Sequence, residues 1–227
     1  GGGGGMSKEE MLEASEGQMN LAAISKAKSD NPVNAEEKYV GKIYEITGIV
    51  DTIESDHVEL LAVNSPIENH ALSGYSDLVH VDVPLSEEEL KELSTKEVIN
   101  VVGRLSAIDG GYQMDQAYYV DNTVTFTGEV TKFILDESMT NHLMWIDSEL
   151  NTSAGFNNCR YVYVVEPVTA FENLEEAEID GVTVKEGDTV TVQGTAVYEN
   201  MTKSSAGTLV VYTLNFDLNT IASVTKE

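Results

Sequence analysis

Residues 43–50 decide the fold of this chain and read Ile-Tyr-Glu-Ile-Thr-Gly-Ile-Val. The stretch is rich in β-branched and aromatic residues, which favour extended strands. Gly48 interrupts the run, and a glycine inside a strand is typical of a sharp bend, as where one strand serves both sides of a small barrel. The pattern Thr-Gly-x-Val returns at residues 127–130. The sequence therefore predicts a bent strand that is used twice.

Around this strand, alternation of apolar and polar residues predicts four more strands before residue 122. Ser86 and Glu89 have the spacing of a capping box, which predicts a short helix. The expected elements are strands at 43–50, 57–63, 78–83, 98–105 and 112–120, with the helix at 86–93. A helix between the third and fourth of five strands is the order of the OB-fold, a partly open barrel.

The same order begins again after residue 122. The expected strands are 123–135, 142–147, 160–165, 190–194 and 209–216, with a helix at 171–177. We therefore expect a mainly β protein of two tandem five-stranded OB-fold-like barrels, preceded by an N-terminal helix. One continuous β-sandwich is the alternative.

The first 34 residues are expected to form a flexible glycine tether and a helix. Apolar residues recur at helical spacing between Ser7 and Asp30, Gly17 weakens the middle, and Pro32 ends the helix. We expect this helix to pack on a barrel, because its largely acidic polar face opposes the alternative of binding a membrane surface. The expected divisions are 1–34 for tether and helix, 35–121 for barrel 1 and 122–227 for barrel 2.

The opening glycines resemble the tether that follows the lipid-modified cysteine of bacterial lipoproteins. This resemblance implies an extracytoplasmic protein that is lipid-anchored to the bacterial membrane through a residue upstream of Gly1. An artificial linker before a start at Met6 is the alternative. The single cysteine, Cys159, excludes an internal disulfide and is expected to be a small buried hydrophobic residue.

The negative charge of the chain disfavours binding to several classes of partner. It holds 39 acidic and 13 basic residues, a formal net charge of −26. Nucleic-acid binding requires lysines and arginines to neutralise phosphates, and the same negative field repels anionic lipids and polysaccharides. The remaining partners are an unknown protein, peptide or glycan, beside the plain interpretation that an acidic surface keeps the protein soluble.

Two segments carry a resemblance to a known family. Residues 34–50, from Asn-Ala-Glu-Glu-Lys to Thr-Gly-Ile-Val, resemble the opening of the bacterial OB-fold family named for its likeness to tRNA anticodon-binding domains. Residues 185–194, Lys-Glu-Gly-Asp-Thr-Val-Thr-Val-Gln-Gly, are similar to its fourth-strand signature. The resemblance covers residues 35–120, and 122–224 more weakly. It implies an exported lipoprotein, and the family name implies nucleic acid, which the net charge opposes.

Aromatic residues are the candidate ligand-binding groups. OB-folds bind ligands on the face of strands two and three and on the flanking loops. The residues in those places are Trp145, Tyr161 and Tyr163 in the second unit and Tyr75 and His80 in the first. Stacking on a sugar or a base is the functional interpretation. Core packing is the plain one for the second-unit aromatics, because the sequence does not say which face of a strand looks inward.

No catalytic, metal or cofactor site is expected, because the common catalytic and nucleotide-binding motifs are absent. The four histidines are His57, His70, His80 and His142. Their spacing along single helices or strands does not suit one metal ion. The acidic groups Asp136-Glu137 and Glu172 with Glu175-Glu176 lack the alternating pattern of a calcium loop.

Taken together, these patterns favour a non-catalytic exported binding or scaffold module at the bacterial cell envelope. Single-stranded nucleic-acid or oligosaccharide binding through the OB-fold aromatic face is the alternative. A hydrolase built on two facing carboxylates is a third hypothesis, which requires the two acids to meet in a cleft.

Overall fold

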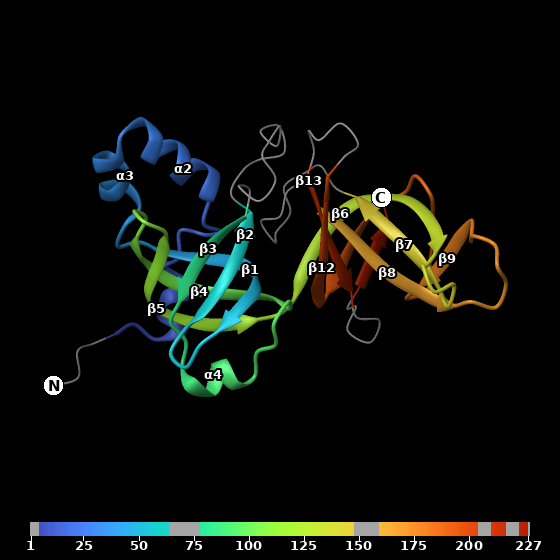
Figure 1. Cartoon of the computed structure of the whole chain (residues 1–227), viewed down its shortest axis with the longest axis horizontal. Helices are drawn as coiled ribbons and strands as arrows, with labels where there is room; N and C mark the ends of the chain where they lie inside the picture. Colours follow the sequence, from blue (N-terminus) through green and yellow to red (C-terminus); the bar gives the residue numbers. More distant parts are fainter. Residues whose placement is uncertain (1–4, 64–77, 148–158, 204–209, 217–222, 227) are drawn as a thin grey trace. The chain divides into compact units, whose positions relative to one another are not determined.

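A computed structural model describes residues 5–63, 78–147, 159–203, 210–216 and 223–226 (Figure 1). The described residues fall into two compact units, with the boundary between Asp121 and Asn122.

Three short helices open the first unit: α1 (Lys8–Ala14), α2 (Leu21–Asp30) and α3 (Pro32–Tyr39). The helix predicted over residues 7–30, with a weak middle at Gly17, is present as two shorter helices, α1 and α2, separated by residues 15–20. Gly17 takes a φ of 96°, a left-handed conformation that interrupts the helical path. Pro32 begins α3 instead of closing the helical region, because the first position of a helix needs no N–H donor.

The helices are capped and packed in ways that the sequence indicates. Ser7 forms a capping box with Glu10, and Asn20 accepts the backbone N–H of Ala23 at the start of α2. Met11 of α1 and Ile24 of α2 are fully buried against barrel residues. The helices thus pack on the barrel as predicted. None of the helices in the described part of the chain is long and apolar enough to span a membrane.

Five strands of the first unit close into a barrel, with α4 (Glu87–Lys91) between the third and fourth. They are β1 (Ile43–Ile53), β2 (Val58–Val63), β3 (Leu78–Val83), β4 (Val98–Ala107) and β5 (Tyr112–Asp121). The order around the barrel is β1-β2-β3-β5-β4, and β4 pairs back onto β1. Only β3 and β5 run parallel. The predicted element order of the first barrel is confirmed and is consistent with an OB-fold.

The barrel closes because β1 changes neighbours along its length. Its first part, from Ile43 to Ile49, pairs with β4, and its last part, from Ile49 to Ile53, pairs with β2. Gly48 lies at this change, where a Cβ atom would stand only 2.9 Å from Cβ of Leu60. Gly103 of β4 is packed more tightly still. Both glycines are needed for the close approach of a neighbouring strand.

The interior of the barrel is filled by apolar side chains from every strand. They include Ile46, Val50, Val58, Leu60, Val81, Val83, Ile99, Val101, Leu105 and Met114. Because strand residues alternate between the two faces, this filling leaves the polar residues of β1, β2 and β3 on the outward face.

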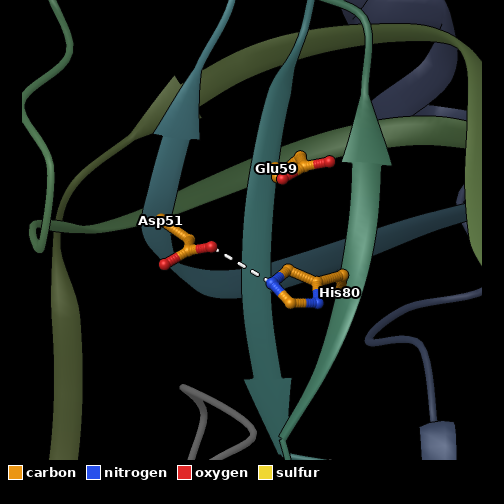
Figure 2. Close-up of side chains that lie close together, drawn as sticks. All are labelled: Asp51, Glu59 and His80. Carbon is orange, nitrogen blue, oxygen red and sulfur yellow. Dashed lines mark hydrogen bonds and ion pairs between the residues drawn. The ribbon is translucent and has the colours of Figure 1, made fainter.

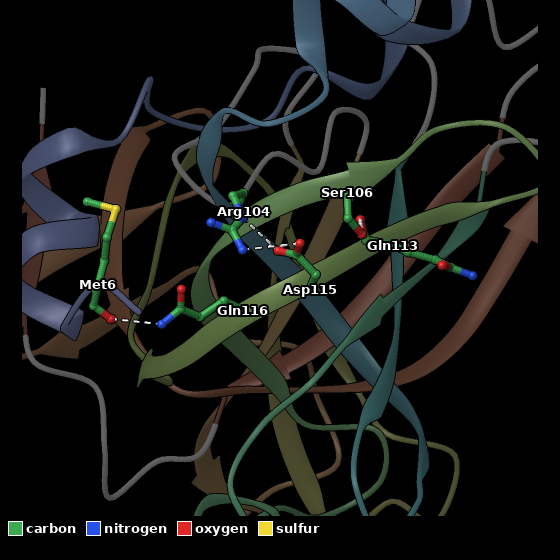
Figure 3. Close-up of polar contacts among 6 residues, drawn as sticks. All are labelled: Met6, Arg104, Ser106, Gln113, Asp115 and Gln116. Atoms are coloured by element: carbon green, nitrogen blue, oxygen red, sulfur yellow. Dashed lines mark hydrogen bonds and ion pairs between the residues drawn. The ribbon is translucent and has the colours of Figure 1, made fainter. Parts of the chain in front are cut away.

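Polar contacts hold the outer surface of β4 and β5. Arg104 forms a bidentate ion pair with Asp115, with N···O distances of 2.8 and 3.2 Å (Figure 3). The backbone oxygen of Met6 accepts hydrogen bonds from the Gln116 amide at 2.9 Å and the Tyr118 hydroxyl at 2.6 Å. The segment before α1 is thereby fixed to β5.

The second unit contains a seven-stranded sheet and a separate hairpin. The sheet consists of β6 (Val124–Leu135), β7 (Asn141–Asp147), β8 (Cys159–Pro167), β11 (Thr189–Gly194), β12 (Ala196–Lys203), β13 (Val210–Phe216) and β14 (Ser223–Lys226). Its order is β12-β13-β8-β7-β6-β11-β14. The hairpin is formed by β9 (Glu176–Ile179) and β10 (Val182–Lys185).

The pairings of the second unit repeat part of the barrel pattern. β8 and β13 are parallel like β3 and β5, and β6 pairs with β11 as β1 pairs with β4. The predicted fourth strand, residues 190–194, is present as β11 beside β6, but a further strand that was not predicted, β12, follows after Thr195 and lies beside β13. Within the described residues, the second unit is therefore a mainly β unit whose pairings do not form a second closed ring.

The helix predicted over residues 171–177 is wrong. Residues 169–172 form bends, and Glu176 already belongs to β9. Two contacts with the sheet hold this segment: the Asn173 side chain accepts the backbone N–H of Leu135, and the Glu172 carbonyl oxygen lies 3.0 Å from Nε2 of His142. In the first unit, by contrast, α4 has its own capping box and buries Leu90.

The tight packing at Gly103 makes a testable prediction. In Gly103→Ala, the new Cβ would lie 2.5 Å from Sδ of Met114 and 2.8 Å from Cβ of Ala117. We expect a loss of about 1–3 kcal/mol in the free energy of unfolding, measured by guanidinium unfolding of the full chain. Gln113→Ala, at an exposed site on β5, is the control and should change stability by less than about 0.5 kcal/mol. Equal stability of the two variants would contradict the packing account.

Candidate functional site

Three carboxylates and two imidazoles gather on the outward face of the first barrel. They are Asp51, His57, Glu59, His80 and Asp82, named here the outer-face cluster. The face belongs to β1, β2 and β3, the part of the fold on which OB-folds bind their ligands.

Strand pairing brings these residues together. Glu59 lies on β2, the middle strand, and is paired with Thr52 of β1 on one side and with Asp82 of β3 on the other. His80 lies two residues before Asp82 on β3, so both side chains leave the same face of the sheet. His57 precedes Glu59 by two residues and shares that face.

A β-bulge places Asp51. Val50 pairs with Leu60, while Thr52 pairs with Glu59, so Asp51 is an extra residue on β1. Its Oδ2 lies 3.1 Å from Nε2 of His80, and the two side chains point toward each other beside Glu59 (Figure 2). The bulge therefore adds a carboxylate to the outward face.

The distances within the cluster suit the ligands of one small cation. The candidate ligand atoms of Asp51, Glu59 and His80 all lie within 4.8 Å of one another, and so do those of His57, Glu59 and Asp82. Glu59 is common to both sets. The side chains of His80 and Asp51 are 58 % and 39 % exposed, so a ligand can reach them from solvent.

His57 is held by a neighbouring carboxylate. Its Nδ1 lies 2.7 Å from Oδ1 of Asp56. This hydrogen bond is the main reason why the pKa of His57 is raised above 6.5; partial burial acts in the opposite direction, and the negative charges of Asp56, Asp82 and Glu54 raise the pKa further.

Apart from the two histidines, the three strands carry no basic side chain to balance these acids. Residues 43–63 and 78–83 contain neither lysine nor arginine. A phosphate or another anion would therefore find no lysine or arginine on these strands, whereas the carboxylates attract cations.

The structure separates the aromatic residues predicted as a site in the second unit. In β7 the buried side chains are His142, Met144 and Ile146, and Trp145 lies between them on the opposite face, half-buried. Tyr163 is buried and pairs with Met144, which places it on the core side. Trp145 and Tyr163 therefore do not form one stacking surface.

Other predicted residues are only partly described. Tyr161 is paired in the backbone with Ile146. Tyr75 and His70, and the side chains of Tyr161 and Cys159, lie outside the described part of the chain.

Sequence reasoning named His80 as a candidate ring for ligand stacking and did not place the four other members of the cluster in a site. It considered histidine spacing within single elements, whereas pairing between strands brings His57 and His80 to one face. A readable signal was present, since residues 57–59 and 80–82 are both His-Val-acid. On neighbouring antiparallel strands such pairs meet on the same face when the registers agree.

Asp136, one of the carboxylates considered for calcium, holds a turn. Its side chain accepts hydrogen bonds from the backbone N–H groups of Thr140 and Asn141 and from both of their side chains, and so holds the turn between β6 and β7. In the described part of the chain, the sets of three side chains whose candidate ligand atoms lie close enough to bind one metal ion are the two sets that share Glu59.

Comparisons with known proteins add no assignment to this site. No family model matches the chain, and no curated protein is similar enough in sequence to count as a relative. The resemblance to the tRNA anticodon-binding-like OB-fold family therefore stays a prediction.

The turn at Asp136 predicts a pH dependence. Burial alone would raise the pKa of this carboxyl, but the hydrogen bonds from Asn141 and Thr140 outweigh it and lower the pKa from 3.8 to about 2. The stabilisation is therefore complete above the ordinary pKa and is lost as the pH falls through the lowered one. We expect Asp136→Asn to lower the melting temperature near neutral pH, and the difference from the wild type to shrink in strong acid. A difference independent of pH, or one matched by Glu137→Gln, would contradict this.

Trp145 is the only tryptophan, so intrinsic fluorescence reports on its ring. The ammonium of Lys132 lies 4.3 Å from the ring centroid and covers one face. We expect Lys132→Ala to shift the emission to longer wavelength, because water reaches the uncovered ring. Lys185→Ala removes a lysine whose ammonium pairs with Glu176 and should leave the spectrum unchanged. Identical spectra for the two variants would show that Lys132 does not cover Trp145 in solution.

Proposed function

We propose that the protein is a non-catalytic binding module whose first barrel docks a positively charged segment of a partner protein. The docking surface is the outward face of β1, β2 and β3. The observation that carries the proposal is the make-up of this face: it holds three carboxylates, and its strands have no lysine or arginine. Complementary charge on a partner favours docking and speeds the encounter.

Nucleic acid is a poorer ligand for the same face. Phosphates need lysine and arginine partners, and bases need exposed aromatic rings on which to stack. Tyr44 is the only tyrosine, phenylalanine or tryptophan in the three strands, and it is buried. The chemistry of the face therefore opposes the ligand that the family name implies.

In this proposal the second unit is the scaffold. Its parallel β8–β13 pair and its β6–β11 pair correspond to pairs of the barrel, and we propose that it is an OB-like barrel with an additional strand, β12. Oligosaccharide stacking on Trp145 is less favoured, since Lys132 already lies over the ring. The lipid-anchored location at the bacterial envelope stays a prediction.

Binding of a fluorescent lysine-rich peptide at low salt tests the proposal. In the variant Asp51→Asn/Glu59→Gln/Asp82→Asn, we expect affinity to fall at least about tenfold, because three charges of the face are lost. A labelled single-stranded oligonucleotide should bind neither protein.

The control removes the same charge elsewhere on the first unit. Glu36→Gln/Glu37→Gln/Glu88→Gln changes three exposed acids that lie outside the face and should leave peptide affinity close to that of the wild type. An equal loss of peptide affinity in both triple variants would show that the peptide responds only to the net charge of the protein, and would reject the docking face. Tight oligonucleotide binding would favour the alternative function.

A further inference from the structure

We propose that the outer-face cluster is a binding site for a divalent transition-metal ion such as Zn²⁺. Glu59 is the ligand shared by two sets, with Asp51 and His80 on one side and His57 and Asp82 on the other. The inference rests on the proposed function in one respect, because both use the negative charge of the same face.

The mixture of donors points to this class of ion. Each set offers one imidazole nitrogen and two carboxylates, and imidazole suits zinc, nickel, copper and iron. Calcium and magnesium prefer oxygen ligands throughout. Two of the four histidines of the chain lie in the cluster, which distinguishes it from a solvated patch of acids.

The distances are close to those of an occupied site. Ligand atoms around a tetrahedral zinc, with bonds of about 2.0–2.1 Å, lie about 3.3 Å apart. The separation of 3.1 Å between Nε2 of His80 and Oδ2 of Asp51 already has this size (Figure 2). Because Glu59 lies within 4.8 Å of both, side-chain movements of about 1.5 Å or less would bring all three atoms onto one ion.

The surrounding structure fixes the positions of the proposed ligand residues. All but His57 lie on paired strands of a closed barrel, so their backbones are fixed, and the β-bulge supplies Asp51. The Asp56 carboxylate accepts a hydrogen bond from Nδ1 of His57, which leaves Nε2 of the ring available to an ion. A carboxylate behind a metal-binding histidine is the usual arrangement that orients its ring.

The charges of the cluster are also incompletely balanced. In the described part of the chain, the only ion pair made by Asp51, Glu59 or Asp82 is that of Asp51 with His80. Three carboxylates that approach one another repel, and a divalent cation between them relieves the repulsion.

Zinc titration of the full chain by calorimetry, with excess Mg²⁺ to occupy sites made of carboxylates alone, tests the proposal. We expect a saturable site that Glu59→Gln weakens at least about tenfold, because the shared ligand is lost. Glu36→Gln, an exposed acid on α3, should bind Zn²⁺ like the wild type. Equal zinc affinity of Glu59→Gln and the wild type would overturn the site.

Histidine ring signals in NMR spectra give a second readout that does not depend on affinity. Zn²⁺ should shift the signals of His57 and His80 but leave those of His142, which is buried in the second unit. Shifts of His142 alone, or no shift of either cluster histidine, would reject the proposed ligands.

The outcomes separate the metal site from the docking face. Zinc binding that depends on Glu59, without binding of the lysine-rich peptide, keeps the metal site and rejects the docking face. Peptide binding that depends on the three carboxylates, without zinc binding, does the reverse. If both occur, Zn²⁺ should weaken peptide binding, because it neutralises the charge that both use.

Discussion

The register of β2 between β1 and β3 is the constraint on which both the core and the outer face of the first barrel depend. Leu60 is paired with Val50 and Val81 inside the barrel, and its neighbour Glu59 is paired with Thr52 and Asp82 outside. Since side chains alternate along a strand, a slip of one residue would bury the acids and expose the apolar residues. The burial of Leu60 therefore also fixes the position of Glu59.

The bulge at Asp51 lets β1 keep an apolar inner face and add a carboxylate to its outer face. Beyond the bulge, Ile53 still pairs with Val58, which is fully buried, so the inner face stays apolar. The extra residue adds a carboxylate to the outer face, next to His80. Bulges of this kind re-aim a side chain at small cost to the ladder. Three acidic side chains are thus held at a fixed place by the same pairing that closes the barrel.

Much of the first barrel could be predicted from local signals. Alternation, the bends at glycine and the capping box of Ser86 and Glu89 each depend on a few neighbouring residues. The additional strand β12, which pairs with β13, and the contacts of Asn173 depend on distant partners, which a single sequence does not show. The hairpin of β9 and β10 was missed although Asp180-Gly181, both with positive φ, is a typical two-residue hairpin turn.

The candidate site was less predictable than the fold, because its residues come from three strands and from the residue just before β2, and Asp51 sits on a bulge. Diffraction from crystals of the full chain grown with Zn²⁺, measured at the zinc absorption edge, tests the central claim most directly. The account predicts an anomalous peak beside Glu59, between the side chains of the outer-face cluster. No peak there, or a β2 register with Glu59 turned into the barrel, would contradict it.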